Sequence, residues 1–309
     1  MIHIHTVLDV IGNTPLVQLK KIVPPGSAEI YIKLEYFNPT GSYKDRMALA
    51  IVEEAEKRGT LKPGMKVLEC TGGSTGTSLA FICSVKGYPF HVISSDAFAK
   101  EKLQSMRLFG ADLELVASEG GRITPDLIPK MIKRAEELNA QGNVYWTRQF
   151  ENEDALAGYK IMGGEILSQI SGPVHTFCAA AGTSGMFSGV SRRLKDANPN
   201  TRSVVLEPAS APLLSQGIKG SHRIDGVGVG FIPPLLRKTD YDEVQTVEEA
   251  DARMMARRLA KEEGIFAGTS TGLNVVAALQ IAKEIGPFNA VVTVACDSGM
   301  KYLASGLFE

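Results

Sequence analysis

Short apolar runs rich in β-branched residues alternate with amphipathic segments along most of the chain. The strand-like runs occupy residues 30–34, 66–69, 90–94, 174–180, 203–207 and 290–296. Helical periodicity follows several of these runs, at residues 45–58, 77–85 and 99–109. Apolar strands that alternate with helices are typical of parallel sheets covered on both faces. The pattern therefore predicts an α/β protein with mostly parallel sheets.

The composition is that of a packed globular protein. Of the 309 residues, 44% are hydrophobic and 22% are charged, which excludes a wholly disordered chain. At roughly 150 residues per domain, the length favours two domains. We expect a boundary near residues 148–153, where a strand-like run gives way to a polar turn.

Charge and hydropathy argue against nucleic acids and membranes as binding partners. Lys and Arg total 33 against 34 Asp and Glu, so no basic excess is present to neutralise nucleic-acid phosphates. No apolar stretch approaches the roughly 20 residues that cross a membrane, and the N-terminus lacks a secretory-signal pattern. Cys70, Cys83, Cys178 and Cys296 lie in apolar runs without CxxC spacing. We therefore expect buried, reduced cysteines in a cytoplasmic protein that binds neither nucleic acid nor a membrane.

Three glycine-rich turns each follow a strand or an apolar run and open a helix. They read TGGSTG at 71–76, GTSG at 182–185 and GTSTG at 268–272. Glycine lets the backbone approach a ligand closely, and the free N–H groups of a helix start favour an anion. None of the turns has the lysine of a P-loop or the GxGxxG of a dinucleotide fold. We expect a small ligand with several polar groups rather than a nucleotide.

A lysine stands at the predicted start of a helix within residues 38–46, NPTGSYKDR. Ser42 and Asp45 resemble a capping box, and an apolar stripe at i, i+4 spacing continues from Met47. This places Lys44 in the first helical turn. If it is desolvated there, its amine can act as a nucleophile or a base. The alternative is a solvated surface lysine.

The sequence resembles fold type II pyridoxal-phosphate enzymes, in particular the cysteine synthase and cystathionine β-synthase family. The resemblance runs in order through IGNTPL at 11–16, residues 38–46, QF at 149–150, AGTSG at 181–185, GVGVGFIP at 226–233, EEGI at 262–265, GTS at 268–270 and DSG at 297–299. It implies two doubly wound α/β domains with the active site in the cleft between them. Residues 1–40 and 152–309 would form the large cofactor-binding domain, and residues 41–151 a small mobile domain. The family also implies a homodimer.

The same resemblance assigns residues to the cofactor, pyridoxal 5'-phosphate, and to the substrate. Lys44 is the catalytic residue that holds the cofactor as an internal aldimine. The other cofactor-binding residues are Ser74, Gly182, Thr183, Ser184, Gly185 and Ser270. The substrate-binding residues are Thr71, Gly72, Gly73, Thr75, Gln149 and Gly226. No metal site is implied.

Two departures from the family pattern concern these turns. The phosphate turn, GTGGT in the family, ends here in Met186, which removes one hydroxyl and predicts weaker cofactor binding. The substrate loop, TSGNTG in the family, has Gly72 and Ser74 in place of serine and asparagine. Because both changes subtract volume and polar groups, they predict a roomier site for a bulkier substrate.

The reaction that the resemblance implies is β-elimination and replacement on an activated L-serine derivative, through an aminoacrylate. Lys44 would remove the α-proton, and sulfide, a thiol or an amine would then attack Cβ. Ser270 is neutral and cannot keep the pyridine nitrogen protonated as a carboxylate would, which favours loss of a β-leaving group over transamination. The leaving group and the nucleophile stay open.

Other functions compete with this interpretation. A serine/threonine-type ammonia-lyase, or dehydratase, uses the same fold and cofactor. A serine hydrolase would use Ser74 in GGSTG as its nucleophile, with His175 or His222 as the base. A non-catalytic module would keep the turns and only bind. Metal catalysis has no support, since no HExxH or Cys/His ligand spacing is present.

Overall fold

The computed structural model describes residues 4–121 and 126–308. Within this part of the chain, contacts group the residues into two compact units. The first unit contains residues up to Ile11 together with Lys44–Ala155, and the second contains Gly12–Tyr43 together with Leu156–Glu309. None of the helices described is long and apolar enough to cross a membrane.

The first unit contains a parallel sheet of four strands, in the order β5-β4-β3-β6. Its strands are β3 (Lys66–Cys70), β4 (Phe90–Ser95), β5 (Asp112–Val116) and β6 (Val144–Trp146). Its helices are η1 (Val7–Val10), α1 (Lys44–Arg58), α2 (Ser74–Lys86), α3 (Lys100–Leu108) and α4 (Leu127–Asn139), of which η1 is a 3₁₀ turn.

Alternation along the strands gives this sheet two buried faces. Val67 and Val92 belong to the core that contains residues of α1, α2 and α3. Leu68 and Ile93, one residue further along, belong to the core under α4. A period of two sends neighbouring side chains to opposite faces, so the interior strands β3 and β4 carry apolar side chains on both faces. Leu8 of η1 joins the first of these cores, and the first unit therefore includes residues up to Ile11.

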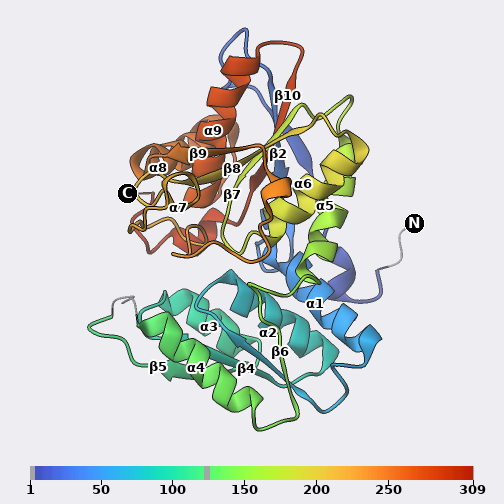
Figure 1. Ribbon diagram of the computed structural model, residues 1–309, viewed down its shortest axis with the longest axis vertical. Coiled ribbons are helices and arrows are strands. Elements are labelled where there is room, and N and C mark those ends of the chain that lie inside the picture. The colour runs from blue at the N-terminus through green and yellow to red at the C-terminus, as the bar shows by residue number, and fades with distance from the viewer. Residues whose placement is uncertain (1–3, 122–125, 309) are drawn as a thin grey trace. The chain divides into compact units, whose positions relative to one another are not determined.

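The second unit contains six strands in the order β1-β2-β10-β7-β8-β9, parallel except for the β1–β2 pair. Its strands are β1 (Leu16–Leu19), β2 (Glu29–Leu34), β7 (Thr176–Ala180), β8 (Arg202–Pro208), β9 (Glu243–Val247) and β10 (Ala290–Ala295). Figure 1 shows β2 and β10, from opposite ends of the chain, side by side in blue and red. The core here includes side chains of β2, β7, β8, β10, α8 and α9.

The helices that follow the second unit's strands complete the α/β pattern. They are α5 (Ala155–Gln169), α6 (Gly185–Ala197), α7 (Leu213–Gln216), α8 (Glu249–Arg258) and α9 (Thr269–Ile285). Short turns are η2 (Glu35–Phe37), η3 (Lys238–Asp240), the π-helical η4 (Leu259–Glu263) and η5 (Gly299–Tyr302). The predicted α/β class with mostly parallel sheets is confirmed.

The unit boundaries differ from the expected domains at the N-terminus. The sequence expectation put residues 1–40 with 152–309, whereas the contacts put residues up to Ile11 with the first unit. The second boundary falls between Ala155 and Leu156, a few residues beyond 151. The mobility that the resemblance implies for residues 41–151 stays a prediction.

Candidate active site

Lys44 is the first residue of α1 and is buried, with only 8% of its surface exposed. The stripe that begins at Met47 is buried as well, since Met47, Ile51 and Ala55 are fully covered. An amine at this position lies where the helix dipole disfavours a positive charge. Burial excludes the alternative of a solvated surface lysine.

The segment before the helix start is held by backbone pairing. The helix begins at Lys44, two residues after Ser42. Ser42 forms an isolated antiparallel bridge with Asp297, and the N–H of Tyr43 donates to the carbonyl of Cys296 at 3.1 Å. The segment before the helix is therefore held by backbone pairing at the end of β10. The capping-box interpretation of Ser42 and Asp45 stays a prediction.

The substrate loop leaves the end of β3 and turns into α2, which begins at Ser74 with Gly73 as its N-cap. The Thr71 hydroxyl accepts from the N–H of Gly73 at 3.2 Å. The Thr75 hydroxyl donates to Oε1 of Gln149 at 2.7 Å, although the two residues are 74 positions apart. Two of the predicted substrate-binding residues thus lie together in the first unit.

A buried carboxylate that the sequence analysis missed positions Gln149. Glu69, only 2% exposed, accepts from the backbone N–H of Gln149 at 3.0 Å and from the hydroxyl of Thr147 at 2.6 Å. It also accepts from the N–H of Cys70 at 2.6 Å. Burial raises the pKa of the Glu69 carboxyl above its ordinary value. The available signal was an acidic residue inside an otherwise apolar strand, which is rare unless the charge has partners.

The space beside Gly72 is filled by an aromatic ring. A Cβ atom built at Gly72 would lie 2.0 Å from Cγ of Phe98. A side chain at position 72 would therefore require the Phe98 ring to move. The roomier site expected from Gly72 and Ser74 stays a prediction.

The phosphate turn runs from the end of β7 into α6 and contains a strained serine. Ser184 is the residue before α6, with a left-handed φ of 64°. Its hydroxyl is buried and has no hydrogen-bond partner among the described residues. A buried polar atom without a partner costs about 1–3 kcal/mol, and strain of this kind gathers at ligand sites.

Close packing brings Gly226 to the same turn. A Cβ atom built at Gly182 would lie 2.0 Å from the carbonyl oxygen of Gly226, so no larger residue fits at 182. Gly182 and Gly226, predicted separately for cofactor and substrate, are neighbours in the second unit. Met186 is buried in the first turn of α6, and its effect on cofactor binding stays a prediction.

Ser270 is the second residue of α9 and is 5% exposed. Its neighbour Thr271 uses its hydroxyl to accept from the N–H of Cys296 at 3.0 Å. Gly268 is the N-cap, where a Cβ atom would lie 2.5 Å from the ring of Tyr302. The turn that carries Ser270 is therefore fixed by contacts on both sides.

The predicted residues divide between the two units. Lys44, Thr71, Gly72, Gly73, Ser74, Thr75 and Gln149 belong to the first unit, and Gly182, Thr183, Ser184, Gly185, Gly226 and Ser270 belong to the second. All of the turns lie at carboxyl ends of strands or at helix starts, as the sequence predicted. The individual roles of these residues stay predictions.

Comparison with known families decides the class of protein. The family described as "Pyridoxal-phosphate dependent enzyme" matches residues 7–297 of this chain. The chain belongs to this family. Pyridoxal phosphate is accordingly its cofactor, and the resemblance seen in the sequence motifs is confirmed.

Individual members of the family match over nearly the full length. A cysteine synthase of Staphylococcus aureus is 40% identical over 308 residues, which is 99% of this chain and 97% of the relative. The solved structure of O-acetyl serine sulfhydrylase isoform 3 from Entamoeba histolytica has a TM-score of 0.93 and 35% identity, covering 99% of this chain and 92% of that one. An O-ureido-L-serine synthase structure has a TM-score of 0.91 and 36% identity, covering 99% and 95%. The fold type II assignment is confirmed.

The phosphate turn fits the phosphate of this cofactor. The unpartnered Ser184 hydroxyl and the N-terminus of α6 supply hydrogen-bond donors to an anion, and Gly182 keeps side-chain atoms out of the turn. The hydrolase alternative lacks a comparable fit. Both ring nitrogens of His222 contact backbone groups, at Gly228 and Ile224, and Nδ1 of His175 accepts from Ala290.

Proposed function

We propose that the protein catalyses β-replacement on an activated L-serine derivative, with sulfide, a thiol or an amine as the nucleophile. The observation that carries the proposal is the buried Lys44 at the start of α1, in a chain that matches a pyridoxal-phosphate family over residues 7–297. The names of three relatives refer to cysteine, O-ureido-L-serine and O-acetyl serine. These amino acids differ from one another in the substituent on Cβ.

Each predicted residue has a distinct task in this reaction. Bound pyridoxal phosphate supplies an electron-withdrawing ring to the α-carbon of the amino acid. Lys44 would hold the cofactor covalently and, once released, accept the α-proton on its amine. The 182–185 turn would bind the phosphate. Ser270 would hydrogen-bond the ring nitrogen without carrying a charge.

The substrate carboxylate would bind at the loop of the first unit. Thr75 and Gln149 already form a hydrogen bond, and the amide of Gln149 donates to the carbonyl of Cys70 at 3.3 Å. Because Glu69 fixes the backbone of Gln149, this pair is oriented before substrate arrives. Such preorganisation lowers the cost of holding the amino acid in a reactive geometry.

The test is a donor titration of the holoenzyme with O-acetyl-L-serine, O-phospho-L-serine, L-serine, L-homocysteine and L-threonine. We expect one activated serine derivative to change the absorbance of the cofactor and to lose its leaving group. When a nucleophile is added, we expect a product with a new Cβ–S or Cβ–N bond. The ammonia-lyase alternative predicts a 2-oxo acid and ammonia at the same rate with and without nucleophile. That result would contradict the proposal.

We also propose a cytoplasmic homodimer. The four cysteines are all buried and free, which is usual in a reducing compartment. Dimerisation is the arrangement that the family resemblance implies, and sedimentation equilibrium of the holoenzyme checks it. A mass equal to that of one chain at micromolar concentration would contradict the homodimer.

A further inference from the structure

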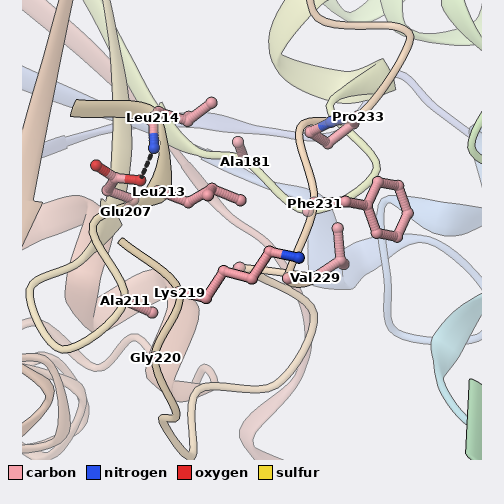
Figure 2. A pocket seen from close by; sticks show the side chains of 13 residues that line it. Ala181, Glu207, Ala211, Leu213, Leu214, Lys219, Gly220, Val229, Phe231 and Pro233 are labelled. Carbon is pink, nitrogen blue, oxygen red and sulfur yellow. Dashed lines mark hydrogen bonds between the residues drawn. The ribbon is translucent and has the colours of Figure 1, made fainter. Parts of the chain in front are cut away.

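The segment 222–228 of the second unit packs against the phosphate turn. The N–H of Gly228 donates to the carbonyl of Ala181 at 3.0 Å, where the turn begins. A Cβ atom built at Gly182 would lie 2.0 Å from the carbonyl oxygen of Gly226. Figure 2 shows Ala181 and Val229, which adjoin these contacts, in the lining of one pocket. The backbone of this segment therefore forms one wall of the phosphate turn.

The hydrogen bond from Gly228 also sets the direction of a donor in the turn. A peptide unit is planar and trans, so its carbonyl and its N–H point in opposite directions. The unit that contains the Ala181 carbonyl also contains the N–H of Gly182, a residue predicted to bind the phosphate. An ordered segment 222–228 therefore orients the N–H of Gly182.

The imidazole of His222 closes the segment into a loop. Its Nε2 lies 3.2 Å from the carbonyl oxygen of Gly228, and its Nδ1 lies 3.2 Å from the backbone nitrogen of Ile224. A carbonyl only accepts and a backbone N–H only donates, so these partners select the neutral ring with its proton on Nε2. One side chain thus donates to Gly228 and accepts from Ile224.

The ring also lies directly on the backbone of Gly228. A Cβ atom built at Gly228 would lie 2.4 Å from Nε2 of His222, and the φ of Gly228 is 57°. Both observations require glycine at this position. The side chains of Ile224 and Val227 are buried in the core of the second unit. Apolar burial therefore anchors the loop, and the histidine fixes the path of its backbone.

The part of the chain before this segment has its own anchors. Glu207, 4% exposed near the end of β8, accepts from the N–H of Leu214 at 2.7 Å and from the N–H of Ser215 at 2.9 Å. Figure 2 shows the first of these bonds. At Gly220 a Cβ atom would lie 1.8 Å from the carbonyl oxygen of Ser210, so the backbone there is closely packed. Loss of the imidazole should therefore loosen the segment 222–228 and leave α7 in place.

We propose that His222 is a positioning residue for the cofactor phosphate. It holds the carbonyl of Gly228, the N–H of Gly228 fixes the peptide between Ala181 and Gly182, and that peptide directs its N–H to the phosphate. The effect is specific to the phosphate, because this series of contacts ends at the phosphate turn. The inference concerns cofactor binding and does not depend on which donor or nucleophile the enzyme uses.

The experiment compares two ligands of the full-length apoenzyme, pyridoxal 5'-phosphate and pyridoxal, which lacks the phosphate. In His222→Ala we expect the Kd of pyridoxal 5'-phosphate to rise about ten-fold and the Kd of pyridoxal to stay within about two-fold. Because Lys44 is expected to react with the aldehyde of either compound, the ratio of the two Kd values isolates the phosphate.

His175→Ala is the matched control for His222→Ala. Nδ1 of His175 also accepts from a backbone N–H, that of Ala290 at 2.9 Å. His175 lies just before β7, however, whereas the phosphate turn follows the other end of this strand. We therefore expect His175→Ala to leave the ratio of the two Kd values unchanged.

Two amide variants separate the two hydrogen bonds of the ring. The amide nitrogen of Gln reaches the position of Nε2, whereas the amide oxygen of Asn reaches the position of Nδ1. His222→Gln should therefore restore most of the affinity for pyridoxal 5'-phosphate. His222→Asn should bind it as weakly as His222→Ala does, because the donor to Gly228 is missing.

Hydrogen exchange of the holoenzyme gives a readout that needs neither turnover nor titration. Peptides that cover 181–185 and 222–230 should exchange faster in His222→Ala than in the wild type or His222→Gln, and peptides from α7 should not. Faster exchange throughout the second unit, an equal rise in both Kd values, or unchanged binding of pyridoxal 5'-phosphate would overturn the inference. So would full affinity in His222→Asn, because the bond to Ile224 would then suffice.

Discussion

Single buried polar groups are the strongest structural indication of a ligand in this protein. The Ser184 hydroxyl is buried in a left-handed residue and lacks a partner among the described residues. Lys44 is buried at a helix start. The Ser184 position is unfavourable for the chain alone and becomes favourable when a phosphate is present. At Lys44, the helix dipole disfavours the charged form of the amine.

Ser184→Ala is expected to have opposite effects on the two forms of the enzyme. Removing a buried hydroxyl without a partner should stabilise the apoenzyme by roughly 1 kcal/mol, because no desolvated group is left. The same change should weaken cofactor binding, since one donor to the phosphate is lost. Thermal unfolding of the apoenzyme measures the change in stability, and titration with the cofactor measures the change in affinity. A less stable apoenzyme would show that the hydroxyl has a structural partner.

Lys44→Ala is expected to abolish turnover and covalent attachment of the cofactor, because it removes the amine that serves as anchor and base. Borohydride reduction followed by mass spectrometry should find the cofactor on the peptide containing Lys44 in the wild type only. Lys57→Ala, an exposed position later on α1, is the matched control. Normal turnover of Lys44→Ala without added amine would contradict the whole assignment.

The contact between Gly72 and Phe98 predicts strong coupling between substitutions. Gly72→Ser would collide with the ring and should cost about 1–3 kcal/mol or raise KM for the amino-acid substrate. Phe98→Ala should remove most of this penalty when the two changes are combined. A double-mutant cycle on unfolding free energy and KM measures the coupling, and additive effects would mean that the ring moves away freely.

At the scale of elements, the interior strands and the edge strand β6 were predictable, whereas three other edge strands were not. All six interior strands, β3, β4, β2, β10, β7 and β8, were expected within about two residues from their apolar runs. The edge strands β1, β5 and β9 are only partly buried and do not form continuous apolar runs, so the sequence analysis did not assign them. An edge strand has one neighbour and more solvent, which weakens its sequence signal.

Glu69, at the end of β3, accepts hydrogen bonds from Thr147 and Gln149 in the segment after β6. Its raised pKa predicts that the free energy of unfolding depends on pH. Because the folded pKa of Glu69 is raised, the native state binds the proton more tightly than the unfolded chain. Its contribution to the free energy of unfolding is therefore greatest below the unfolded pKa and falls as pH rises through the folded pKa. We expect Glu69→Gln to remove this fall above the ordinary value of 4.5.

Urea unfolding of wild type and Glu69→Gln at several pH values from 4 upward measures this difference. The variant should also raise KM for the amino-acid substrate, because Gln has only one acceptor oxygen, whereas the carboxylate accepts from Gln149 and Thr147 on one oxygen and from Cys70 on the other. A wild-type minus variant difference that does not change with pH would mean that Glu69 keeps one protonation state throughout.

At the scale of the whole molecule, cofactor binding should add to the stability of the native state. A ligand that binds only the folded chain contributes about 2.7 kcal/mol at a concentration 100-fold above its Kd. Stripping pyridoxal phosphate should therefore lower Tm, and adding it back should restore Tm in a concentration-dependent manner. An unchanged Tm with full cofactor occupancy would indicate that the unfolded chain binds the cofactor equally well.

The sequence alone determined the α/β class, the cofactor family, the lysine at the helix start and the three glycine-rich turns. These features are local, since strand and helix periods, turn glycines and short motifs are read within about ten residues. The tertiary structure decided which distant residues meet. Thr75 and Gln149 form their bond across 74 positions, and the Phe98 ring fills the space beside Gly72.

The same distinction holds for the groups that sequence reasoning missed or misplaced. Glu69 and the bridge of Ser42 to Asp297 both depend on strand order and on how loops pack at strand ends. Periodicity assigns a side chain to a face of its own element, but it does not determine which neighbour covers that face. The packing of the sheet and its loops determines that neighbour, because residues far apart in the chain bury one another and form hydrogen bonds with one another.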